Sequence, residues 1–362
     1  GNGGVATLTA APAAQTTITA TTTTAFTNTN AIASGSWYLY CTTFDGSVAK
    51  LNSLTTYNSN VGAFATTSQG QLPTPYSYGE GSSTALSIGG TQYLYTIGGF
   101  NGASTYYSTV YKATIDSSGN AGAFATTSQG QIANAMYTMI KSVTIGGTSY
   151  IYVLGGSGAG GIVSTVYKST IDTSGNAGAF STTSQGQLPL PLVNGDAVTA
   201  SIGGTTYIYA IGGYTPTGST TKSTVYKATI DSSGNVGTFA TTSQAQLPAA
   251  MYANQSVTAS ISGTQYIYVL GGDISSNGSG TYASTVYKAA IDSSGNVGTF
   301  ATTSQSQLPV VLGFHSAIVV STGGTSYIYV LGGATGTDKS TVYKAVVDSS
   351  GNVGAFATTS QA

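Results

Sequence analysis

The sequence predicts an all-β protein in which one four-stranded unit is repeated six times. A Val-Tyr-Lys triplet recurs about every 60 residues, and each copy is followed by a turn of the Asp-Ser-Ser-Gly-Asn type and then by an Ala-Phe-Ala-Thr-Thr-Ser-Gln segment. Short apolar and alternating runs of strand length fill the remainder of each copy. A repeat of this kind stacks on its neighbours instead of folding alone. The lysines of the repeat are Lys50 in a degenerate first copy and Lys112, Lys168, Lys227, Lys288 and Lys344 in five clear copies.

The fifth unit shows the expected strands in order. Residues 256–261 alternate polar and apolar side chains, and Gly263 closes a tight hairpin where most other units have Gly-Gly. Residues 266–270 form a continuous apolar run, which is typical of a strand covered on both faces. Residues 284–291 are the third strand and 298–303 the fourth. Four strands per repeat predict a six-bladed β-propeller, with seven blades as the alternative if the chain ends add strands.

The repeat also resembles a known family. The run Tyr-Ile-Tyr-Val-Leu-Gly-Gly, the Val-Tyr-Lys triplet, an aromatic residue in the fourth strand and a Leu-Pro pair are similar to a kelch repeat, over essentially the whole chain. The chain departs from that pattern in having Phe300 and its counterparts where kelch repeats usually have Trp, and Thr43-Phe44 in place of the first Gly-Gly. The resemblance implies a β-propeller scaffold and leaves the chemistry open.

Composition narrows the classes of function. Only 5% of the residues are charged, the net charge is −1 and Arg is absent, so no basic surface exists for nucleic acid. A nearly neutral surface favours association between copies. No apolar run approaches the roughly 20 residues of a membrane span. The Ser-, Thr-, Gly- and Tyr-rich composition predicts an extracellular or cell-surface protein.

Catalytic chemistry is poorly provided for. The chain has one Cys and one His, which excludes a disulfide framework and any centre with several His ligands. The copper radical oxidases of the kelch class need such a centre. Five of the ten acidic residues are the repeated turn aspartates, which turn formation explains. We therefore expect no enzyme activity, no catalytic residues, no metal and no cofactor.

The loops between the second and third strands carry most of the variation and emerge on one face, opposite the Gly-Gly hairpins. This variable face is the candidate binding face. One polar residue lies just before the first strand of each of five successive units, where it would ring the mouth of a central channel. Two interpretations remain: a small polar pocket for a sugar or other neutral ligand, or a solvated rim, which we favour. The five residues are Glu80, Lys141, Asp196, Gln255 and His315.

Residues 1–12 resemble an additional fourth strand with its turn, centred on Val5, Thr7 and Leu8, and precede a single domain at 13–362. They are either a tail or a connector that pairs with an exposed sheet edge of another subunit. Such a heterologous contact propagates into a filament.

These observations predict a non-enzymatic structural protein that assembles with itself into a filament or surface layer. The alternative is a carbohydrate-binding module that uses the variable face. Asn254 and Asn277 fit the N-glycosylation pattern.

Overall fold

The computed structural model describes residues 64–66, 69–73, 83–100, 106–126, 130–132, 137–241, 244–276, 280–302 and 305–358. It also describes the backbone of four earlier strands: β1 (Ala6–Leu8), β2 (Ile18–Ala20), β3 (Trp37–Thr42) and β4 (Val48–Leu51). The regular secondary structure of these described residues consists of β-strands, and no helix occurs among them. The predicted all-β class is therefore confirmed.

Five antiparallel sheets repeat one three-stranded pattern, in which the middle strand pairs with both others. We number them sheets 2 to 6 in chain order. They are β6 (Ser83–Ile88), β7 (Thr91–Phe100) and β8 (Tyr106–Ile115); β9 (Met139–Ile145), β10 (Thr148–Leu154) and β13 (Val166–Ile171); β14 (Asp196–Ile202), β15 (Thr205–Ile211) and β18 (Val225–Ile230); β19 (Gln255–Ile261), β20 (Thr264–Leu270) and β21 (Val286–Ile291); and β22 (Ser316–Thr322), β23 (Thr325–Leu331) and β24 (Val342–Val347).

Turn residues set where these strands reverse. In sheet 4 the hairpin between β14 and β15 is closed by Gly203 and Gly204, with φ of 56° and 82°. Glycine reaches this left-handed region without steric cost. After β18, the carboxylate of Asp231 accepts hydrogen bonds from the backbone N–H groups of Ser233 (2.9 Å) and Asn235 (2.7 Å). The repeated aspartate therefore shapes the turn, as the sequence predicts.

The outermost segment of each unit is less regular than expected. In sheet 5 it meets β21 through two isolated bridges, Ile291 with Val297 and Lys288 with Ala301, and through a hydrogen bond from Gly298 N–H to the carbonyl oxygen of Ala290. Between these bridges the outer segment has one residue more than β21, which is the arrangement of a β-bulge. The extra residue interrupts the ladder of hydrogen bonds. The fourth strand predicted at 298–303 is therefore not a continuous strand in the described residues.

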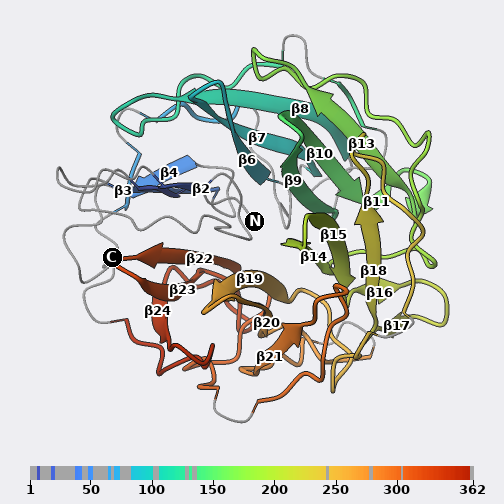
Figure 1. The fold of residues 1–362 in the computed structure, drawn as a ribbon, viewed down its shortest axis with the longest axis vertical. Coiled ribbons are helices and arrows are strands. Elements are labelled where there is room, and N and C mark those ends of the chain that lie inside the picture. The colour runs from blue at the N-terminus through green and yellow to red at the C-terminus, as the bar shows by residue number, and fades with distance from the viewer. Residues whose placement is uncertain are drawn as a thin grey trace.

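The sheets stand around a common centre, with β6, β9, β14, β19 and β22 nearest to it (Figure 1). Neighbouring strands of this inner set contact one another. The core lies between adjacent sheets: one cluster joins Leu270 and Val286 of sheet 5 to Ile328 and Val330 of sheet 6. Similar clusters lie between sheets 2 and 3, 3 and 4, and 4 and 5, so sheets 3, 4 and 5 are covered on both faces, which explains the continuous apolar runs of their middle strands.

Sheet 1 has the order β2-β1-β3-β4-β5, where β5 is Phe64–Ala65. In this sheet β1 pairs with both neighbours, and Leu8 lies opposite Trp37 of β3 and Ile18 of β2. Residues 6–8 thus lie beside the second strand of their own unit, on the side away from β5, and not in the outer position expected from their likeness to a fourth strand. Thr7 and Leu8 belong to this pairing, whereas Val5 lies outside the described residues. Exchange with another subunit stays a hypothesis.

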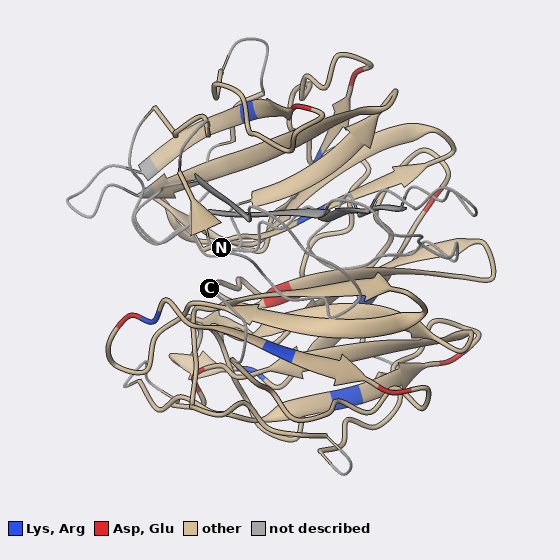
Figure 2. Cartoon of the chain, turned by 90° about the vertical axis from the view of Figure 1, so that its left-hand side faces the viewer, with Lys and Arg blue, Asp and Glu red and all other residues tan. Residues whose placement is uncertain are grey.

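Charged residues are few and are scattered among the strands and loops (Figure 2). No helix long and apolar enough to cross a membrane occurs among the described residues. Two short ribbons, β11 (Ser157–Gly158) with β12 (Gly161–Ile162) and β16 (Tyr214–Thr215) with β17 (Thr220–Thr221), extend from the loops after β10 and β15.

Candidate functional site

Four residues at corresponding positions, each two residues before a first strand, have left-handed backbone conformations. Their φ angles are 57° at Tyr137, 52° at Asn194, 52° at Ala253 and 57° at Phe314. Such angles are uncommon outside glycine, and for bulky residues they store strain of about 1–3 kcal/mol each. Backbone strain repeated in four successive units marks this level of the molecule as a candidate functional site.

Backbone hydrogen bonds join these four residues in a row. Asn194 N–H donates to the carbonyl oxygen of Tyr137 at 3.1 Å, Ala253 N–H to that of Asn194 at 2.6 Å, and Phe314 N–H to that of Ala253 at 3.0 Å. Each bond crosses from one sheet to the next. The row therefore links sheets 3, 4, 5 and 6 directly, and it holds the strained conformations in place.

A hollow of about 340 Å³ lies next to this row of residues. The left-handed residues Tyr137, Asn194 and Phe314 contribute to its wall. Ser157, Ile162 and Tyr214 come from the two short ribbons, and Val193 and Tyr252 complete the lining. No side chain in this set is charged. The lining residues come from the units of sheets 3, 4, 5 and 6, which the row of hydrogen bonds brings together.

The aromatic side chains of the hollow support one another. The ring centroids are 6.1 Å apart for Tyr214 and Tyr252, and 6.2 Å apart for Tyr252 and Phe314. Tyr282 adds an edge-to-face contact with Phe314 at 6.0 Å. Offset and edge-on pairs of this kind are favourable. The aromatic wall is thus packed before any ligand arrives.

A buried carboxylate fixes the central tyrosine. The hydroxyl of Tyr252 donates to Oδ2 of Asp273 at 2.8 Å. Asp273 is fully buried and also accepts from the backbone N–H groups of Ser275 (2.8 Å) and Gly280 (3.1 Å). Burial, with the neighbouring Asp273, raises the pKa of Tyr252. This tyrosine therefore stays a neutral phenol with a defined orientation.

The polar residues predicted at the channel mouth lie just beneath this level. Asp196 and Gln255 open β14 and β19, and His315 directly precedes β22. Lys141 lies two residues deeper, because it pairs with Tyr152 inside β9 and β10. All four are buried, with exposed fractions of 0–5%. The solvated-rim interpretation is therefore wrong for these four, and none of them lines the hollow. Glu80 lies outside the described residues.

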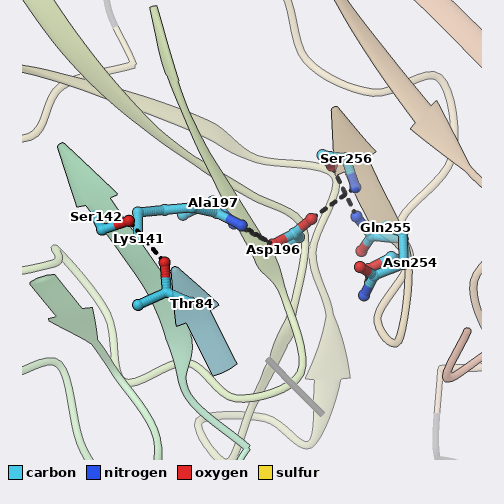
Figure 3. Close-up of polar contacts among 8 residues, drawn as sticks. All are labelled: Thr84, Lys141, Ser142, Asp196, Ala197, Asn254, Gln255 and Ser256. Atoms are coloured by element: carbon cyan, nitrogen blue, oxygen red, sulfur yellow. Dashed lines mark hydrogen bonds and ion pairs between the residues drawn. The ribbon is translucent and has the colours of Figure 1, made fainter. Parts of the chain in front are cut away.

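Lys141 and Asp196 form an ion pair across two sheets (Figure 3). Nζ of Lys141 lies 3.2 Å from Oδ1 of Asp196, and the two side chains are 0% and 1% exposed. Burial lowers the pKa of Lys141 and raises the pKa of Asp196, and in both cases the charge of the partner opposes the shift. Beside the pair, the hydroxyls of Thr84 and Ser142 join β6 to β9 at 2.7 Å.

His315 is held neutral. It is fully buried, neither ring nitrogen has a hydrogen-bond partner among the described residues, and burial lowers its pKa to about 3. No group of three metal-ligating side chains gathers in the described part of the chain. Of the two glycosylation candidates, Asn254 is 1% exposed and unsuited to sugar attachment in the folded protein. Asn277 lies outside the described residues.

Sequence reasoning missed the hollow. Its left-handed positions are occupied by Tyr, Asn, Ala and Phe, and only asparagine signals that conformation. The variable loops after β10 and β15 did indicate the face, since they supply three of the lining residues.

Comparisons with known proteins bear on the fold. No protein-family model matches the sequence, and no curated protein matches it. Among solved structures, the one described as "Structure of YjhT" is similar, with a TM-score of 0.56 and 12% sequence identity over 90% of this chain and 95% of that chain. At this identity the likeness concerns the fold alone.

Proposed function

We propose that the chain is a six-bladed, kelch-type β-propeller that acts as a non-enzymatic binding protein, and that the hollow takes an uncharged saccharide. The single observation that carries this proposal is the lining of the hollow: four aromatic side chains, two aliphatic ones and the neutral polar residues Ser157 and Asn194. Its volume of about 340 Å³ is that of a small-ligand site.

The chemistry of the lining selects among ligand classes. Aromatic rings cover the apolar C–H faces of a sugar, and tyrosine hydroxyls, Ser157 and Asn194 supply hydrogen bonds to its hydroxyl groups. A phosphate or carboxylate ligand needs a cation or a cluster of N–H donors, and the lining holds no cationic side chain. A neutral, ring-shaped polyol therefore fits better than an anion.

Preorganisation supports binding at this site. Tyr252 is fixed by Asp273, and the strained backbone of Asn194 and Phe314 is held by the row of hydrogen bonds. A rigid wall loses little conformational entropy on binding.

A glycan array with the purified chain tests the proposal. We expect the wild type to bind a defined set of neutral glycans, and Tyr214→Ala to weaken that binding by tenfold or more, because Tyr214 lines the hollow and is half-buried. Tyr167→Ala is the matched control, since Tyr167 is also half-buried but lies in β13 away from the hollow. Equal loss in both variants, or no glycan bound by a folded wild type, contradicts the proposal.

A second candidate is a structural role at the cell surface through self-association. It is favoured by the scarcity of charge over the described surface, since like charges would otherwise keep copies apart (Figure 2). Electron microscopy of the full chain beside a chain lacking residues 1–12 tests this role. Filaments or sheets from the full chain support it. Single particles in both samples, with the truncated chain melting like the full chain, contradict it.

A further inference from the structure

We propose that Lys141 and Asp196 are joined by an intramolecular amide bond, which links β9 of sheet 3 covalently to β14 of sheet 4. The two groups come from different sheets and meet with 3.2 Å between Nζ and Oδ1, at a place where both side chains are buried. The amine is thus held next to the carboxyl group whose Cγ it would attack, and groups fixed beside one another react far faster than the same groups free in solution.

The position of Lys141 is unlike its counterparts. Lys141 lies opposite Tyr152, and the residues that lie opposite the corresponding tyrosines of sheets 2, 4, 5 and 6 are Thr84, Val198, Val257 and Ile318. Three of these four counterparts are apolar and none is charged. A buried ion pair brings no clear gain in stability over apolar packing, because both charges must be desolvated. The exception in sheet 3 therefore calls for a chemical reason.

Two backbone N–H groups hold the carboxyl group of Asp196 in place beside the amine of Lys141. Oδ1 of Asp196 accepts from Ala197 N–H at 2.7 Å and Oδ2 from Ser256 N–H at 2.6 Å (Figure 3). Nζ of Lys141 lies 3.2 Å from Oδ1 of the same carboxyl group. The amine nitrogen thus lies beside a carboxyl group whose position is fixed by two backbone N–H groups.

The surroundings favour the reactive protonation states. Burial disfavours both charges, so it lowers the pKa of Lys141 and raises the pKa of Asp196. Transfer of one proton from the ammonium to the carboxylate gives a neutral amine, which is a nucleophile, and a carboxylic acid, which can lose water.

The reaction balances without a co-reactant. The lone pair of Nζ forms a bond to Cγ of Asp196, and the carbonyl electron pair moves onto Oδ2, where Ser256 N–H stabilises it. The Cγ–Oδ1 bond then breaks, and Oδ1 leaves as water with the acid proton and one proton from nitrogen. The net change is ammonium plus carboxylate to amide plus one water.

Lys168 lacks these conditions. It donates to Oδ1 of Asn235 at 2.7 Å and to the carbonyl of Ser233 at 3.1 Å. Its nitrogen also lies over the Tyr150 ring, 5.4 Å from the centroid. This lysine is committed to hydrogen bonds and faces no carboxyl group in these contacts, so it serves as the matched control.

Mass spectrometry of the denatured full chain tests the bond. We expect a mass one water below that of the sequence, and after proteolysis a branched peptide that contains both Lys141 and Asp196. Lys141→Arg keeps the charge but cannot form the amide, so it should show the full sequence mass. Lys168→Arg should still lose one water.

A second variant keeps the test decisive if Lys141→Arg does not fold. Asp196→Asn presents an amide to the same amine, so it should lose one ammonia and reach the same branched product. A folded wild type that keeps its full sequence mass and yields no branched peptide after prolonged incubation overturns the proposal. That result would leave the saccharide proposal untouched, because the hollow does not depend on the bond.

Discussion

The hydroxyl of Tyr95 donates a hydrogen bond to the carbonyl oxygen of Gly175 in the next sheet, at 2.6 Å. The same bond recurs at the next three junctions, from Tyr152, Tyr209 and Tyr268. Beside each one, the repeated lysine donates to the asparagine of the same turn; Lys227, for example, lies 2.6 Å from Oδ1 of Asn296. We call this set of contacts the clasp. It gives the repeated motif a structural purpose, because the Val-Tyr-Lys lysine of one unit binds the turn of the following unit.

We expect Tyr209→Phe to lower the free energy of unfolding by about 1–2 kcal/mol, since it leaves the buried carbonyl of Gly295 without its donor. Urea denaturation measures the change. Tyr207→Phe is the control: the ring of Tyr207, 6.3 Å from that of Tyr209, packs against Gly295, and removal of its hydroxyl should change stability by less than about 0.5 kcal/mol. Equal effects of the two substitutions would rule out the hydrogen bond as the source.

The clasp also requires glycine in the turn. A Cβ atom at Gly295 would lie 2.6 Å from the Tyr207 ring, and its φ is 74°. We expect Gly295→Ala to cost about 2–5 kcal/mol, the sum of backbone strain and overpacking. Gly204→Ala isolates the backbone part, because φ there is 82° and a Cβ would meet nothing within 4 Å. Thermal or chemical denaturation should rank Gly295→Ala well below Gly204→Ala, and the reverse order would contradict the packing argument.

His315 should make stability depend on pH in the weakly acidic range. Its pKa falls from 6.5 to about 3 on folding because the ring is buried, so the unfolded chain binds the proton more tightly. Stability contributed by the neutral ring is complete above pH 6.5 and decreases by about 1.4 kcal/mol per pH unit as the pH falls towards 3. His315→Asn should flatten the curve of unfolding free energy between pH 6 and 4. An unchanged slope in this variant would show that His315 is not its cause.

The turn aspartates should act at lower pH. The pKa of Asp231 is held below its usual value, chiefly by the hydrogen bond from Asn235 N–H. A depressed pKa contributes stability that is present above about pH 4 and is lost as the pH falls through the folded value. We expect Asp231→Asn to lower the melting temperature at pH 7 and to reduce the further loss between about pH 4 and 2. A melting curve with the wild-type acid dependence would disprove this role.

Local patterns in the sequence predicted much of the fold. The Gly203–Gly204 hairpin, the apolar middle strands and the Asp231 turn follow from backbone preferences of neighbouring residues. The position of β1 did not follow, because a segment of strand-forming residues pairs with any edge that the tertiary structure offers.

The candidate site was harder to predict for a different reason. Lys141, Asp196 and His315 were recognised as unusual, yet their burial depends on the packing of adjacent sheets, which no local pattern encodes. The register of β9 with β10 moves Lys141 two residues inward from the expected level. The row depends on the left-handed backbone conformation, which occurs here in Tyr, Asn, Ala and Phe, so no common side chain marks it in the sequence.

The row from Tyr137 to Phe314 depends on backbone spacing and not on the identity of its side chains. Each left-handed residue lies two positions before the first residue of its strand, with one residue between them, and the hydrogen bonds of the row join backbone atoms alone. An insertion between a left-handed residue and its strand would displace the bonds that this residue makes in the row, whereas the ribbon loops lie outside these bonds. In the proposed binding role, ligand preference can change by substitution at Tyr137, Asn194 and Phe314, the row residues that line the hollow, while the spacing that ties neighbouring units together is kept.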